Sequence, residues 1–102
     1  MYTTCRIYSN ATELGDLIIA NRSEIEALLR SCEGFQAYYL VKTADGVMSI
    51  TVCDSQVGTD QSTQKAADWV KSKGAGLSGT KPVIQAGPTP MAFTSAKAAV
   101  TA

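Results

Sequence analysis

FQAYYLVKTADGVMSITVC, residues 35–53, is the stretch that decides the fold. Aromatic and β-branched residues fill its two arms, residues 35–43 and 47–53, and such residues are typical of strands. Between the arms lies Ala44-Asp45-Gly46, a tight turn whose glycine can take a positive φ without steric cost. The stretch therefore predicts a β-hairpin at the centre of the chain.

The segments on either side of the hairpin complete a short series of elements. Residues 2–9 predict a strand, followed by a helix that we expect to break near Asn21; Ser23 and Glu26 form an S-x-x-E capping box for the helix that follows. Residues 54–73 have a helical composition, with a weakly apolar stripe of Thr63, Ala66, Ala67 and Val70. Residues 82–86 predict a last strand that could resume at residues 91–94 after a proline-containing break. The alanine-rich tail, residues 95–102, is expected to be frayed.

This order, β-α-β-β-α-β, predicts one α+β domain of the ferredoxin-like type over residues 1–94. Right-handed crossovers give an antiparallel four-stranded sheet with the helices on one face. The opposite face stays bare and must meet water, a ligand or another sheet. Because a chain of 102 residues leaves much apolar surface hard to cover alone, we expect this face to form a homodimer.

Composition excludes several classes of function. Nine basic residues balance nine acidic ones without clustering, so nucleic acid is not an expected partner. The chain has no histidine, which excludes Ser-His-Asp and Cys-His nucleophile systems. The three cysteines lack metal-ligand spacing, so neither a metal nor another cofactor is expected. No apolar run approaches the roughly 20 residues of a membrane span and no signal peptide is evident, which favours a cytoplasmic location.

The residues Gly34-Phe35-Gln36-Ala37-Tyr38-Tyr39-Leu40 resemble the Gly-Phe-x-x-Tyr strand of the dimeric α/β-barrel superfamily. This superfamily includes antibiotic-biosynthesis-type monooxygenases. The hairpin, Cys53-Asp54 and Trp69 agree with the resemblance, which covers residues 1–94. It implies that two sheet faces pack across a two-fold axis and that a pocket lies between each sheet and its helices. Haem-degrading members use a histidine ligand, and this chain has none.

Arg6 and Tyr8 are the first candidates for such a pocket, because strand periodicity puts them on the same face. Arg6 would anchor an anion and Tyr8 would donate a hydrogen bond. The alternative is an interface pair, in which Arg6 bonds to a carboxylate or a carbonyl across the dimer axis.

Tyr38, Asn21 and Trp69 are the remaining candidates. Cofactor-independent monooxygenases of the resembling group use Asn, Trp and Tyr to bind a phenolic substrate that itself activates oxygen, which implies these roles for the three residues. The ordinary alternatives are a helix cap for Asn21 and core packing for the two aromatic residues. Tyr38 and Tyr39 point to opposite faces of their strand, and parity alone does not say which of them faces the pocket.

The sequence thus predicts a small dimeric α/β-barrel protein that binds or oxidises a small hydrophobic or phenolic compound without a cofactor. A non-catalytic ligand-binding or accessory dimer is the alternative. The expected ligand-binding residues are Arg6, Tyr8, Asn21, Tyr38 and Trp69.

Overall fold

A computed structural model describes residues 1–73 and 81–95 of the chain. It is an α+β structure with four strands and three helices, compatible with the ferredoxin-like arrangement. The predicted break at Asn21 is present. It divides the first helical segment into two helices, where the simplest β-α-β-β-α-β pattern has one. The elements are β1 (Tyr2–Tyr8), α1 (Thr12–Ala20), α2 (Arg22–Arg30), β2 (Phe35–Lys42), β3 (Val47–Cys53), α3 (Gln56–Lys73) and β4 (Val83–Pro88).

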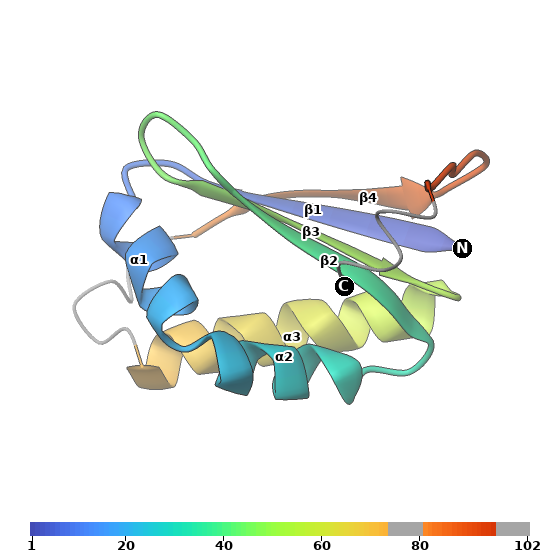
Figure 1. Ribbon diagram of the computed structural model, residues 1–102, viewed down its shortest axis with the longest axis horizontal. Coiled ribbons are helices and arrows are strands. Elements are labelled where there is room, and N and C mark those ends of the chain that lie inside the picture. Colours follow the sequence, from blue (N-terminus) through green and yellow to red (C-terminus); the bar gives the residue numbers. More distant parts are fainter. Residues whose placement is uncertain (74–80, 96–102) are drawn as a thin grey trace.

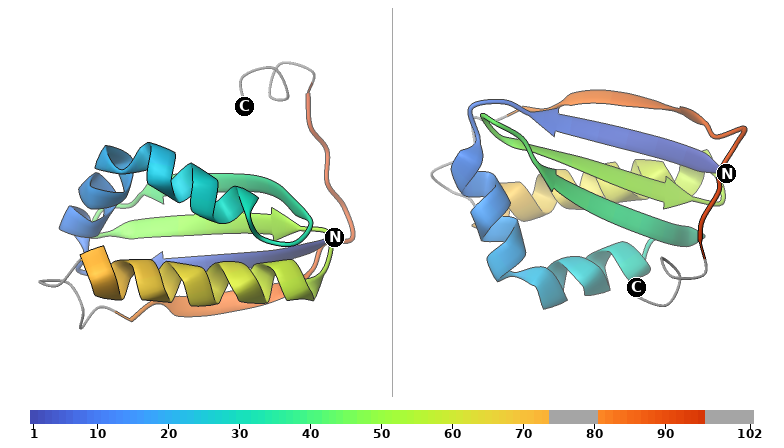
Figure 2. Two further views of the ribbon diagram at one scale, coloured as in Figure 1. Left: turned by 90° about the horizontal axis from the view of Figure 1, so that it is seen from below. Right: turned by 45° about the horizontal axis from the view of Figure 1, so that its top comes forward.

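The four strands form one antiparallel sheet in the order β2-β3-β1-β4, with β1 and β3 at its centre. All three helices pack on the same face of this sheet (Figure 1). Helix α3 lies against β1 and β3, whereas α2 runs beside α3 and contacts β2 (Figure 2). None of the helices within residues 1–73 and 81–95 is long and apolar enough to cross a membrane.

Strand parity separates a covered face from a bare face of the sheet. Residues that pair across strands share a face, and the central β1–β3 pairs Thr4–Thr51, Arg6–Ser49 and Tyr8–Val47 are buried under the helices. The covered face is therefore unusually polar along its middle.

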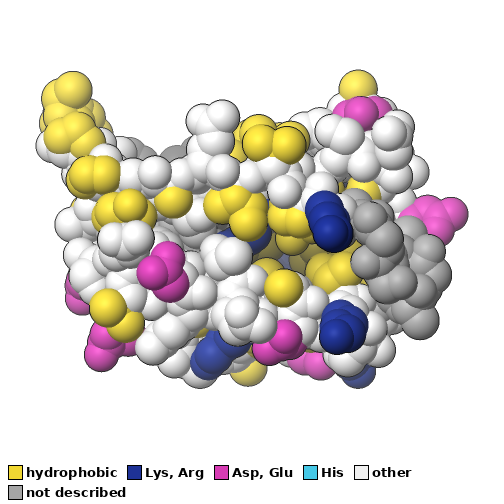
Figure 3. All heavy atoms as spheres, turned by 180° about the vertical axis from the view of Figure 1, so that it is seen from behind, with side chains coloured by type: hydrophobic (Ala, Val, Ile, Leu, Met, Phe, Trp, Pro, Cys, Tyr) yellow, Lys and Arg dark blue, Asp and Glu magenta, His cyan; other side chains and the backbone are white. Residues whose placement is uncertain are grey.

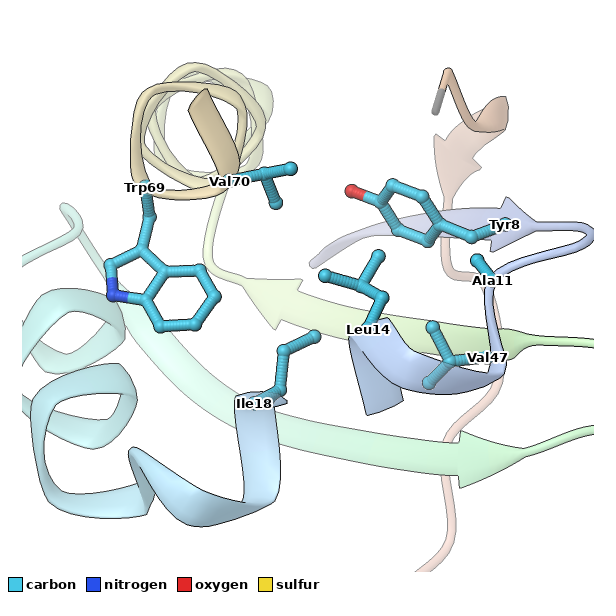
Figure 4. Close-up of a cluster of buried hydrophobic side chains, with 7 residues drawn as sticks. All are labelled: Tyr8, Ala11, Leu14, Ile18, Val47, Trp69 and Val70. Carbon is cyan, nitrogen blue, oxygen red and sulfur yellow. The ribbon is translucent and has the colours of Figure 1, made fainter. Parts of the chain in front are cut away.

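The apolar core lies at one end of this covered face. Leu14 and Ile18 of α1 pack with Trp69 and Val70 of α3 (Figure 4). The sheet contributes Tyr8 and Val47, and Ala11 directly precedes α1. Leu14 is completely buried, and burying a side chain of this size contributes roughly 1.5–3 kcal/mol. Apolar packing thus joins the helices to the sheet mainly through α1 and the C-terminal half of α3.

Two details of the predicted elements are wrong. Helix α2 begins at Arg22 with Asn21 as its N-cap, and no side chain bonds to its free N–H groups, so the S-x-x-E capping box does not form. Residues 91–94 do not resume the last strand. The backbone N–H of Thr89 donates to the Met1 carbonyl, and the chain then leaves the sheet.

The segment beyond β4 rises above the sheet edge and carries mostly apolar side chains (Figure 3). Met91 is 74% exposed and Phe93 is 90% exposed. Of the tail that we expect to be frayed, residues 95–102, only Ser95 lies within the described residues.

Gly46, in the hairpin turn, lies where β1 leaves the sheet. A Cβ atom at this position would clash with the backbone carbonyl of Tyr8, which cannot move without disturbing the β1–β3 ladder. A Cβ atom at Gly87, in β4, would meet no atom within 4 Å.

We expect Gly46→Ala to lower the free energy of unfolding by about 1–3 kcal/mol, because the added methyl group forces a backbone shift. Urea unfolding at fixed protein concentration measures the change. Gly87→Ala is the matched control and should unfold within about 0.5 kcal/mol of the wild type. Equal stability of the two variants would contradict the close packing of the turn.

Candidate functional site

Arg6 is the centre of the polar region under the helices. Its side chain is only 2% exposed, and its guanidinium lies between the sheet and α3. Strand β3 supplies two acceptors, with Nε 3.1 Å from Ser49 Oγ and Nη2 2.8 Å from Thr51 Oγ1. Helix α3 supplies two more, with Nη1 3.2 Å from Ser62 Oγ and 2.9 Å from Thr63 Oγ1. The two hydrogen bonds from Nη1 join the sheet to α3, and the other two join β1 to β3.

All four acceptors of Arg6 are neutral hydroxyl groups. Among the described residues, the three salt bridges join other, exposed side chains, so no carboxylate neutralises the guanidinium. A buried charge without a counter-ion costs several kcal/mol even after relaxation. Hydrogen bonds to hydroxyls satisfy the N–H groups but leave the positive charge in place.

The pKa values of the neighbouring groups reflect this burial. Desolvation lowers the pKa of Arg6, and the groups that oppose this effect are tyrosines and cysteines. Desolvation also raises the pKa values of Tyr8 and Tyr38 above their ordinary value. The Arg6 charge opposes that rise for both phenols, and for Tyr38 a side-chain hydrogen bond with Ser49 does so as well. Both hydroxyls are therefore protonated at neutral pH and can donate hydrogen bonds.

A cavity of about 30 Å³ lies beside the guanidinium, between the sheet and the three helices. This volume has room for about one or two water molecules. Its polar lining comes from the sheet, and its apolar lining comes mainly from α2 and α3, with Ile18 from α1. The lining residues are Arg6, Tyr8, Tyr38, Ser49, Ile18, Ile25, Leu28, Leu29, Ala66, Trp69 and Val70.

Four of the five expected site residues line this cavity. Arg6 and Tyr8 face the helices, so they do not form an interface pair on the bare face. Tyr38 lines the cavity too, whereas Tyr39 points to the bare face and is 53% exposed. Parity had left the choice between the two tyrosines open.

Trp69 lines the cavity and also belongs to the apolar core, so its packing role and its place in the site coexist. Its Nε1 is buried without a hydrogen-bond partner in the described part of the chain, and it lies on the side of the ring away from Tyr8 (Figure 4). An unpaired buried donor is uncommon, since it forfeits its bond to water.

Asn21 does not line the cavity. Its Nδ2 donates to the Leu17 carbonyl at 2.8 Å, and its backbone N–H donates to the Leu17 and Ile18 carbonyls near the end of α1. This is the capping role that was the alternative to ligand binding. Asn21 ends α1 and starts α2.

The hydroxyl partners of Arg6 were not foreseen from the sequence. Ser49, Thr51, Ser62 and Thr63 are common surface residues, and Ser62 lies outside the apolar stripe of α3. A usable signal was the parity of β3, which puts Ser49 and Thr51 on the face opposite Met48 and Ile50.

No protein-family model matches the chain, and no curated protein matches its sequence. The described residues also contain no group of three or more His, Cys, Asp or Glu side chains that could hold a metal ion. The site is therefore interpreted from its own geometry.

We expect Arg6→Lys to lower the free energy of unfolding by about 2–3 kcal/mol, because an ammonium group cannot span acceptors on both β3 and α3. Urea unfolding at fixed protein concentration measures the loss. Arg30→Lys is the matched control, since Arg30 forms an exposed pair with Glu26, and it should change stability by less than about 0.5 kcal/mol. Similar small effects of both variants would argue against Arg6 as the link between sheet and helix.

Proposed function

We propose that this protein is a homodimer that binds a small hydrophobic or phenolic compound between its sheet and its helices. The observation that carries the binding proposal is the cavity beside Arg6, in which a few polar side chains converge among apolar walls. Small-molecule sites commonly have this composition, with the apolar walls supplying affinity and the polar groups fixing orientation.

The cavity must widen to admit a ring, and α2 is the wall that can move. Of its nine residues only Leu29 is buried, whereas Ile25 and Leu28 are partly exposed. The break at Asn21 separates α2 from α1, and Leu14 and Ile18 hold α1 in the core. An outward shift of α2 enlarges the cavity while the rest of the core stays in place.

Trp69 is the only tryptophan in the chain, and it lines the cavity, so its fluorescence reports on binding there. We expect 4-ethylphenol to change this fluorescence in a saturable way. Ala66→Leu should weaken binding at least about tenfold, because the larger side chain fills the cavity from α3.

The neighbouring Ala67 is exposed and does not line the cavity, so Ala67→Leu is the matched control and should bind 4-ethylphenol as the wild type does. Equal binding of 4-ethylphenol by Ala66→Leu and the wild type would place the compound outside the cavity. No fluorescence response of the wild type to 4-ethylphenol would refute the site and favour the accessory dimer.

The bare face of the sheet supports the dimer. Its middle row, Tyr39–Ile50–Cys5–Gln85, crosses all four strands, and apolar residues predominate in the rows on either side. None of the twelve residues that pair in these three rows is charged. The rows are completed by Val41, Met48, Ile7, Val83, Ala37, Val52, Thr3 and Gly87.

A sheet face of this kind is unusual for a surface in contact with water, since large exposed apolar patches mark interaction sites. A second copy of the chain is the partner that fits, because an uncharged apolar face is complementary to itself under two-fold symmetry. Pairing through the sheet face is also what the resemblance to the dimeric α/β-barrel superfamily implies.

We expect light scattering at micromolar concentration to give about twice the chain mass of 10.7 kDa. Ile50→Glu should shift the protein to the monomer, because it introduces a charge in the centre of the bare face. Val57→Glu introduces the same charge on the exposed surface of α3 and should leave the mass unchanged. A monomeric wild type would refute the dimer.

A further inference from the structure

The polar lining of the cavity is composed of hydrogen-bond donors and one positive charge. Arg6 has five N–H groups, Trp69 has one, and the hydroxyls of Tyr8 and Tyr38 are protonated at neutral pH. Ser49 completes the polar lining, and among the described residues no carboxylate and no lysine lines the cavity.

The donors at this site are not all satisfied within the described chain. Four of the five N–H groups of Arg6 donate to hydroxyls of β3 and α3. One N–H group on Nη2 is therefore left without an acceptor. The indole N–H of Trp69 also lacks a partner. Arg6 is only 2% exposed, and its guanidinium has no counter-ion in residues 1–73 and 81–95.

A ligand with an anionic oxygen supplies both features that Arg6 lacks, an acceptor for its free Nη2–H group and a counter-charge. A neutral ligand supplies only the acceptor, and a cation adds a second positive charge to a desolvated site. The apolar walls from the helices, mainly α2 and α3, require that the rest of the ligand be apolar.

We infer that the site selects small apolar compounds whose polar group is an anionic oxygen, a carboxylate or a phenolate. This inference rests on the proposed binding site and specifies the charge of its ligand. Arg6 sets the selectivity by its charge, and its hydroxyl partners hold the guanidinium at the cavity wall.

Three ligands of nearly the same shape test the charge directly. Benzoate, benzamide and benzamidinium are planar and differ mainly in carrying a negative, zero or positive charge. In titrations of Trp69 fluorescence at pH 7 we expect benzoate to bind at least tenfold more tightly than benzamide. Benzamidinium should not bind.

A second pair of measurements assigns the selectivity to Arg6. In Arg6→Met the preference for benzoate over benzamide should disappear, whereas Arg30→Met, which removes an exposed arginine, should keep it. If Arg6→Met does not fold, the relative affinities of the wild type for the three ligands still test the charge selectivity.

Phenolate is tested separately with 4-nitrophenol, whose anion absorbs in the visible. Binding should lower its apparent pKa in the wild type and in Arg30→Met. An unchanged or raised pKa would contradict the role of the guanidinium for phenols.

The outcomes separate the two proposals. If benzamide binds as tightly as benzoate, or benzamidinium binds more tightly than either, the charge selectivity is wrong and the binding site stands. If none of the three ligands and no phenol changes the Trp69 fluorescence, both proposals fail.

Discussion

A guanidinium buried under the helices without a counter-ion is the constraint on which the rest of the structure depends. Arg6 must find acceptors on every side, and it finds them on β3 and on α3. This requirement explains why the covered face is polar along its middle and why serine and threonine side chains are buried on an amphipathic helix. Such hydrogen bonds are directional, whereas apolar packing tolerates small rotations and shifts. The position of α3 along the sheet therefore depends on Arg6. The apolar core, which packs against the C-terminal half of α3, stabilises this position.

The same feature shows how far the sequence predicts the structure. The hairpin from Phe35 to Cys53, the first strand and the break at Asn21 are all visible in local patterns, because turn chemistry and strand periodicity act between near neighbours. The face of α3 that packs on the sheet is not visible in this way. Its hydrophobic stripe predicts Ala67 inside, yet Ala67 is exposed and Ser62 is buried. The helix turns toward a partner some 56 residues away in the chain, Arg6, and a pattern confined to α3 carries no trace of it.

The same contrast applies to the candidate site: local patterns predict part of it, and the rest depends on residues that are distant in the chain. Parity alone grouped Arg6 with Tyr8, and both line the cavity. It could not choose between Tyr38 and Tyr39, because that choice depends on which face the helices cover. Asn21 was ambiguous for a different reason: the side chain that can cap a helix can also bind a ligand, and only the position of the Leu17 carbonyl decides. Tyr38 is half-buried and lines the cavity, whereas Tyr39 is exposed on the uncharged sheet face, so the two neighbours face different surfaces.

The separation of α1 from α2 has a consequence for affinity. If the ring-sized cavity exists only while α2 is displaced, the protein that binds is a minor conformer, and the apparent dissociation constant equals the intrinsic one divided by the population of that conformer. Substitutions of Ile25 or Leu28 can then tighten or weaken binding without touching the ligand, by changing how often the helix opens. Affinity and selectivity would reside in different elements: α2 sets how much of the protein is competent, and Arg6 sets which ligand the competent form prefers.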